Sequence, residues 1–333
     1  MYRRKFSLLF SALVLLALAK TSQAQVTTEP VGFSKITIPA GGGVNAAATA
    51  VLGFSLQPAP VDARSVDTVG STTLTSTSAA WTANQFTTNP YFVLIKSGTS
   101  IGKSFLITTQ TSSQQLTVDS GGANLSSIIA PGDKFQISPA LTLGGLANLA
   151  STSFLSNEEY TQADNLLIWN GAGYYTYWND GTQWSRIGSP ANQANTIIYP
   201  DEAIFVIRRG TSAITLTLTG SVPTVGLKTQ ISGSGGDLIA NRFPVSLTLT
   251  QLGLHQLPGW AANEDYTLAD NVLIWSGSSW ETYWYDGSNW EKIGSPQVQD
   301  TKVISEGSGL FIRRKNGSNA STTFLNQALP YSL

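Results

Sequence analysis

Apolar and polar residues alternate along short segments of this chain, and the clearest such segment occurs twice. Asn157–Pro190 reads NEEYTQADNLLIWNGAGYYTYWNDGTQWSRIGSP, and Asn263–Pro296 reads NEDYTLADNVLIWSGSSWETYWYDGSNWEKIGSP. The two copies align without a gap at an offset of 106 residues, with 21 of 34 positions identical. Short alternating runs bounded by Gly, Asn and Asp are typical of β-strands. Their duplication predicts an all-β protein built from two tandem β-sandwich-like repeats.

Each copy predicts a three-stranded meander. In the first copy the strands are LLIW, YYTYW and QWSRIG, and Asp180-Gly181 separates the last two. Asp-Gly between aromatic runs is a strong signal for a hairpin with a two-residue loop. A loop of this length places Tyr177 opposite Trp184 in the first copy and Tyr283 opposite Trp290 in the second.

The same register makes Glu281 and Lys292 cross-strand partners, and their opposite charges agree with it. One face of the middle strand differs between the copies, since Tyr175 of the first copy becomes Glu281 in the second. We therefore expect this face to contact solvent. The opposite face of that strand is the predicted core face, and it carries Tyr174, Thr176 and Trp178.

The duplication also suggests how the chain divides into domains. Beyond the meander the pattern predicts that the offset shifts by one residue, because VIRR at 206–209 matches FIRR at 311–314. Val31-Gly32 leads to Gly41-Gly42 as Val225-Gly226 leads to Gly235-Gly236, which indicates where each copy starts. The second repeat is then 225–333. The first is 139–224 together with the N-terminal strands of residues 25–60, and the intervening segment is inserted in that repeat or precedes it.

Residues 61–138 predict a small antiparallel β-module, either a barrel or a sandwich. Five strand-like runs, each bounded by turn residues, lie within it: STTLTST, YFVLIKSG, KSFLITTQ, QQLTVDS and DKFQIS. Trp81 and Phe86 lie between the first two runs and are expected to fill its core.

The first 24 residues have the pattern of a secretory signal peptide. A basic segment at 2–5 precedes an apolar run at 6–19, and Ser22-Gln23-Ala24 fits a cleavage site. The apolar run is too short to span a bilayer, so we expect no membrane span after cleavage. The mature chain then has 15 basic and 20 acidic residues, a net charge of −5, which argues against a nucleic-acid partner. The sequence contains no cysteine, so no disulfide stabilises an exported chain.

Catalytic and metal chemistry have few candidate residues. His255 is the single histidine, and we interpret it as a loop or core residue because no nucleophile motif accompanies it. We expect no metal site of His and Cys residues and no cofactor. Two repeated acidic sets remain, which could serve glycoside hydrolysis or bind calcium, although turn capping explains them more simply: Glu158, Glu159 and Asp164 in the first copy, and Glu264, Asp265 and Asp270 in the second.

The hairpin aromatics are the best candidates for ligand binding. Sugar rings stack on exposed aromatic faces, and Tyr177, Trp184, Tyr283 and Trp290 could form such platforms in a polysaccharide-binding module. The alternative interpretation is that they are packing pairs within the fold. The basic pairs at 208–209 and 313–314 end a strand in each copy, and we expect them to protect an edge and to pair with the few acids.

Several short motifs occur together in this chain: WTANQF at 81–86, GKSF at 102–105, PGDKF at 131–135, the Trp169–Trp178 hairpin, FIRR at 311–314 and LPY at 329–331. With these motifs the chain resembles an uncharacterised family of signal-peptide-bearing secreted proteins of environmental Gram-negative bacteria. The resemblance implies export and assigns no functional residue.

These observations predict an exported, non-catalytic β-repeat protein. Its expected role is structural or adhesive, at the cell envelope, in the periplasm or outside the cell, with polysaccharide or envelope components as partners. Polysaccharide binding is the first alternative function, and glycoside hydrolysis by paired carboxylates is the second.

Overall fold

The computed structural model describes residues 29–315 and 322–332, and the predicted signal peptide at 1–24 lies outside this range. The chain is 40% strand and 5% helix, and its strands form several antiparallel sheets. No sheet of the described residues closes into a barrel. The predicted all-β, sandwich-like fold class is therefore confirmed.

The first repeat combines segments from both sides of the inserted module. β1 (Val31–Ile38) pairs with β16 (Ile214–Ser221) along its whole length, and β2 (Ala48–Leu52) pairs with β15 (Ile204–Arg208) at the edge of a five-stranded sheet. The strands nearest the N-terminus thus complete sheets formed by residues 141–221. The remaining elements of this repeat are β10 (Leu141–Thr142), α2 (Leu143–Asn148), β11 (Asn165–Trp169), β12 (Tyr174–Asn179), β13 (Trp184–Arg186) and β14 (Ile197–Ile198).

The second repeat has the same arrangement in one continuous segment. Its five-stranded sheet has the order β18-β24-β20-β21-β22, which matches β2-β15-β11-β12-β13 of the first repeat. Its elements are β17 (Leu227–Ile231), β18 (Gly235–Ala240), β19 (Leu247–Thr248), α3 (Leu249–Leu252), η2 (Leu254–Gln256), β20 (Asn271–Trp275), β21 (Trp280–Tyr285), β22 (Trp290–Lys292), β23 (Val303–Ile304), β24 (Gly309–Arg314) and β25 (Thr323–Gln327).

The offset of 106 residues between the copies also holds for β15 and β24, the strands that follow the meander in each five-stranded sheet. Asn165 pairs with Ile207, and Asn271 pairs with Arg313. Arg208 is therefore equivalent to Arg314, and the shift by one residue predicted from the two Ile-Arg-Arg motifs is wrong. Gly41-Gly42 and Gly235-Gly236 are not equivalent positions either. Gly235 pairs with Arg314, and the equivalent Arg208 pairs with Ala48, so Gly235 corresponds to Ala48.

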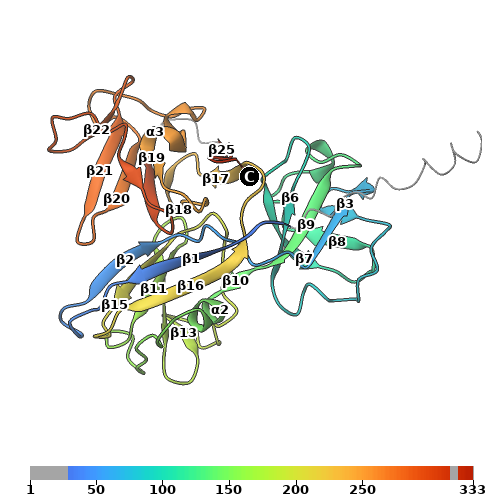
Figure 1. Cartoon of the computed structure of the whole chain (residues 1–333), viewed down its shortest axis with the longest axis horizontal. Helices are drawn as coiled ribbons and strands as arrows, with labels where there is room; N and C mark the ends of the chain where they lie inside the picture. The colour runs from blue at the N-terminus through green and yellow to red at the C-terminus, as the bar shows by residue number, and fades with distance from the viewer. Residues whose placement is uncertain (1–28, 316–321, 333) are drawn as a thin grey trace, which may run out of the picture.

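The inserted module forms one seven-stranded sheet beside the two repeats (Figure 1). The five predicted strands are present, and Trp81 and Phe86 are buried in its core as expected. Two short strands at 62–65 and 68–69 were not predicted. The elements are β3 (Asp62–Ser65), β4 (Thr68–Val69), β5 (Thr73–Thr75), β6 (Tyr91–Ile95), β7 (Ser104–Thr109), β8 (Gln115–Val118), η1 (Leu125–Ser127) and β9 (Lys134–Pro139).

The hairpin loop is longer than predicted. Asn179 pairs with Trp184, so the loop has four residues, 180–183, and Tyr177 pairs with Arg186 instead of Trp184. In the second copy Tyr283 likewise pairs with Lys292. The predicted register is wrong by two residues, because the Asp180 side chain accepts hydrogen bonds from the backbone N–H groups of residues 182 and 183 and stabilises a wider turn.

The two repeats contact one another through a reciprocal aromatic interface. The Trp169 ring lies 4.9 Å from that of Phe311, and Trp275 lies 5.1 Å from Phe205, measured between ring centroids. Exchanging the copies converts one contact into the other, as in an isologous dimer interface. Reciprocal backbone bonds accompany it: the amide of Gly53 donates to the carbonyl of residue 307, and that of residue 240 donates to the carbonyl of 201. The duplicated units are thus arranged like two subunits of a dimer.

Candidate functional site

The four predicted platform residues lie in the cores of the repeats. Tyr177 and Trp184 are 3% and 5% exposed, and Tyr283 and Trp290 are fully buried. They lie on the face of the meander that packs into the core of their own repeat. The opposite face, which was predicted to be the core face, contacts the other repeat: Trp280, the equivalent of Tyr174, lies 6.0 Å from Phe205 between ring centroids. A buried ring offers no surface to a sugar. The predicted platform is therefore wrong, and the alternative of packing residues is right.

The repeated aspartates, Asp164 and Asp270, form buried ion pairs within the fold. In the first copy the Asp164 carboxylate pairs with Arg208, and it also accepts backbone N–H groups of Leu155 at 2.7 Å and of Arg209 at 2.6 Å. Both charged groups are at most 3% exposed. The oxygen lone pairs that calcium or a sugar would need are already used, and neither can reach them.

The second copy repeats this arrangement. Asp270 lies 3.2 Å from Arg314 and accepts backbone N–H groups of Ala261 and Lys315. Glu158 and Glu264, by contrast, are exposed on loops. The interpretation of Asp164 and Asp270 as calcium ligands or hydrolytic acids is therefore wrong. The predicted pairing of Arg208 and Arg314 with scarce acids is confirmed, whereas their predicted protection of a sheet edge is wrong because β15 and β24 are paired on both sides.

His255 has a packing role. Its ring centroid lies 4.7 Å from that of Tyr285 and 6.0 Å from that of Trp290. Burial lowers the pKa of His255, while the negative charge of Asp300 opposes this shift. The imidazole belongs to the apolar environment around Trp290, in agreement with the interpretation as a core histidine.

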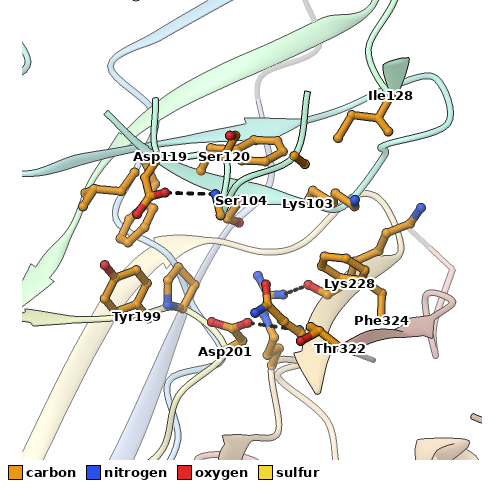
Figure 2. Close-up of a pocket in the computed structure, with 18 residues that line it drawn as sticks. Lys103, Ser104, Asp119, Ser120, Ile128, Tyr199, Asp201, Lys228, Thr322 and Phe324 are labelled. Atoms are coloured by element: carbon orange, nitrogen blue, oxygen red, sulfur yellow. Dashed lines mark hydrogen bonds between the residues drawn. The ribbon is translucent and has the colours of Figure 1, made fainter. Parts of the chain in front are cut away.

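A different site emerges where the inserted module meets both repeats. Here a cavity of about 430 Å³, which we call the junction cleft, is lined by residues from all three units. Figure 2 shows Lys103 and Ser104 of the module on one side, Tyr199 and Asp201 of the first repeat on another, and Lys228 of the second repeat facing them. No single repeat could form this cleft.

Backbone contacts position the module at this junction. The carbonyl of Gly102 accepts the N–H of Lys228 at 3.1 Å, which ties the end of a module turn to β17. Gly102 has a φ of +84°, and a Cβ at this position would lie 2.2 Å from the carbonyl oxygen of Gly226. Only glycine allows this conformation and this close approach.

Aromatic rings line the junction cleft. Phe92 of the module and Tyr199 of the first repeat pack edge to face, with centroids 5.4 Å apart. Phe324 of β25 lines another part of the cleft, beneath the Lys103 ammonium group. Tyr199 remains 37% exposed, so its ring is available to a ligand.

Charged side chains surround these rings. Lys103, Lys228 and Arg242 contribute positive charge, and Asp119 and Asp201 contribute negative charge. Burial, followed by repulsion from Lys228, lowers the pKa of Lys103. The cleft therefore combines apolar ring surfaces with hydrogen-bonding groups of both signs, which is the composition of a ligand-binding pocket.

A second cavity of about 250 Å³ shares residues with the junction cleft, including Tyr199 and Asp201. It also contains Glu202 and Asp237, which approach from the two repeats. Glu202 forms an isolated β-bridge with Ile239, so Asp237 lies diagonally across on the same face, with a Cα separation of about 7–8 Å. Two carboxyl groups from different repeats thus share one recess.

Burial, assisted by the charge of Asp201, raises the pKa of Glu202 to about 7. The folded chain consequently binds this proton more tightly than the unfolded chain does. As pH rises from about 4.5 to 7, the unfolded state loses the proton first, and we expect stability to fall by at most about 3 kcal/mol. Urea unfolding across this range should show the loss in the wild type. The Glu202→Gln variant should lack this component, and parallel pH profiles of the two proteins would contradict the assignment.

The cleft residues were missed because each is a single residue from a distant segment. A usable signal was nevertheless present, since the two copies differ in charge at these positions. Asp201 of the junction cleft and Glu202 of the second cavity correspond to Gly307 and Ser308 at the offset of 106. Arg242 corresponds to Ser55, because β18 and β2 are equivalent strands in which Gly235 matches Ala48. The duplicated scaffold has diverged where the module covers it.

Comparison of the chain with protein-family models, with curated proteins and with solved structures finds no match. Within residues 29–315 and 322–332, no helix has the length and hydropathy of a membrane span. The same residues contain no cluster of three or more His, Cys, Asp or Glu side chains arranged to hold a metal ion.

Proposed function

We propose that the protein is an exported, non-catalytic protein with a structural or adhesive role at the cell envelope or outside the cell, and that it binds polysaccharide in the junction cleft. The observation that carries the proposal is the composition of this cleft, in which exposed ring surface adjoins charged and hydroxyl groups. Tyr199 and Phe324 offer faces on which sugar C–H groups stack. Ser104, Ser120 and Gln230 offer hydrogen bonds to sugar hydroxyls.

The pattern of the first 24 residues supports export. The reciprocal interface between the repeats supports a structural role, because it joins the two units through packed rings and backbone hydrogen bonds. A rigid body of this kind suits a protein that presents a preformed cleft to a polymer.

Binding of the mature chain to a panel of polysaccharides tests the proposal. We expect at least one to bind, and Tyr199→Ala to weaken binding by about tenfold or more, since burial of a large apolar side chain contributes about 1.5–3 kcal/mol. Tyr175→Ala is the matched control, because Tyr175 is 43% exposed and lies on a hairpin away from the cleft. The proposal fails if no polysaccharide binds, or if both variants bind equally well.

Glycoside hydrolysis remains a second candidate because of Glu202 and Asp237. A protonated carboxylic acid near neutral pH beside a second carboxyl group is the arrangement that general-acid cleavage of a glycosidic bond requires. Incubation of each bound polysaccharide with the wild type, followed by measurement of reducing ends, tests this candidate. Release that disappears in Glu202→Gln would replace the non-catalytic proposal, and its absence from the wild type would remove the hydrolase.

A further inference from the structure

Arg242 is a buried cation whose hydrogen bonds are largely unused. It is 3% exposed, and it lines the junction cleft from the segment that follows β18. Its Nη1 donates to the carbonyl oxygen of Lys228 at 2.8 Å, and its Nε has no partner. No carboxylate among the described residues forms an ion pair with it. A buried charge without an anionic partner is strongly unfavourable. This guanidinium is therefore suited to bind an anion from outside the described part of the chain.

Two lysines add positive charge to the same cleft. The Lys103 ammonium lies 4.0 Å from the centroid of the Phe324 ring and donates no hydrogen bond to a described residue. The Lys228 ammonium donates to the carbonyl oxygen of Thr99 at 2.7 Å. Repulsion from Lys228 contributes to the lowered pKa of Lys103. The two like charges are therefore close enough to interact, and a shared anion would relieve the repulsion.

The acids of the cleft do not neutralise these three cations. Asp201 accepts the backbone N–H of Gln230 at 3.4 Å, and Asp119 accepts that of Gly121 at 2.9 Å. Neither forms an ion pair with a basic residue of the cleft. The field of Asp201 supports the charged form of Arg242, since it opposes the effect of burial on the pKa of that group. Three positive groups thus face two negative ones in a partly dry recess.

The three cations come from separate parts of the fold. Lys103 belongs to the inserted module, Lys228 to the first strand of the second repeat, and Arg242 to the turn after β18. The position equivalent to Arg242 in the first repeat is Ser55. The shared scaffold therefore does not require an arginine at this position, and the positive charge is specific to the second repeat.

We propose that Arg242, Lys228 and Lys103 bind the anionic oxygens of an acidic polysaccharide, as a uronate carboxylate or a sulfate ester, while Tyr199 and Phe324 contact its sugar rings. Guanidinium and ammonium groups donate charge-assisted hydrogen bonds to both kinds of anion. This inference rests on the proposed polysaccharide binding and specifies the class of polymer.

Isothermal titration of the mature chain with three oligosaccharides of equal length tests the inference: a polyuronate, a sulfated glucan and a neutral glucan. We expect an acidic oligosaccharide to bind at least about tenfold more tightly than the neutral one, because hydrogen bonds to charged groups are stronger than those between neutral groups. Its affinity should fall as the salt concentration rises, since salt screens exposed charges.

Lys103→Gln should lower the affinity for the acidic ligand about tenfold, and it should lower the affinity for the neutral ligand by a smaller factor. Lys35→Gln on the exposed face of β1 is the matched control for loss of one positive charge. Arg242→Gln should have a larger effect than Lys103→Gln, and thermal unfolding checks that this buried variant is folded. Lys103→Gln keeps the test decisive if Arg242→Gln does not fold.

The outcomes separate the two proposals. Equal affinity for acidic and neutral oligosaccharides, unaltered by Lys103→Gln, would overturn the anion site and leave polysaccharide binding intact. No binding of any oligosaccharide would overturn polysaccharide binding itself. Competition by inorganic sulfate at the same concentration as the sulfated glucan would show that the site recognises a small free anion, and this would overturn the assignment to a polymer.

Discussion

Replacement of Asp164 by alanine is expected to lower the free energy of unfolding by about 3–5 kcal/mol, because it leaves a buried arginine without its counter-charge. The carboxylate pairs with Arg208 and also accepts the backbone N–H groups of Leu155, Arg209 and Gly210. Its loss would leave several buried donors unsatisfied at once. Urea unfolding monitored by tryptophan fluorescence measures the effect.

Glu158→Ala is the matched control, since Glu158 is an exposed acid in the same repeated segment, and its removal should change stability by less than about 0.5 kcal/mol. Asp270→Ala should reproduce the loss in the second repeat, where Arg314 takes the place of Arg208. If both aspartate variants unfold at the wild-type urea concentration, the buried Asp164–Arg208 and Asp270–Arg314 ion pairs do not stabilise the repeats.

The sequence predicted the strands of the meander but not their register. Asp180-Gly181 occurs in a four-residue loop, although this dipeptide favours a two-residue one. The error shifts the pairing by two residues, and a period-2 pattern is unchanged by such a shift. Glu281 and Lys292 consequently still form an ion pair of 2.7 Å, as diagonal neighbours rather than direct partners.

The two faces of the meander could not be distinguished from the sequence because both carry aromatic residues that pack. One face, with Tyr177 and Trp184, fills the core of its own repeat. The other, represented by Trp169 and Tyr174, packs toward the second repeat. The sequence difference between the copies at position 175/281 suggested a solvent-exposed face. This position nevertheless has a specific contact in each copy: Tyr175 stacks with Arg186, and Glu281 pairs with Lys292.

The junction cleft depends on tertiary docking that no local pattern encodes. Lys103, Asp201, Lys228 and Arg242 lie on four separate segments, and the turn at Gly102 brings the first of them against the third. Periodicity reports which face of a strand is buried in its own sheet. It carries no information on which surfaces of neighbouring units meet, so the sequence pattern does not predict this site.

Replacement of Trp290 by alanine is expected to destabilise the protein by about 3–5 kcal/mol, because it removes a large buried ring and leaves a void. Trp290 is fully buried, and its ring packs against Trp260 and Tyr285 with centroids 6.0 and 5.7 Å apart. Its position in the core also predicts that the folded variant binds polysaccharide as tightly as the wild type. Urea unfolding and titration with the bound polysaccharide measure the two quantities on one preparation.

Tyr175→Ala is again the suitable comparison. This residue belongs to the equivalent hairpin of the first copy, but it is 43% exposed and stacks on Arg186. It should lose less than about 1 kcal/mol, in line with other surface substitutions. A Trp290→Ala variant that kept wild-type stability and lost polysaccharide binding would restore the hairpin aromatics as a ligand platform. A variant that loses stability alone places the duplicated tryptophans in the scaffold and leaves ligand recognition to the junction cleft, where the two copies differ.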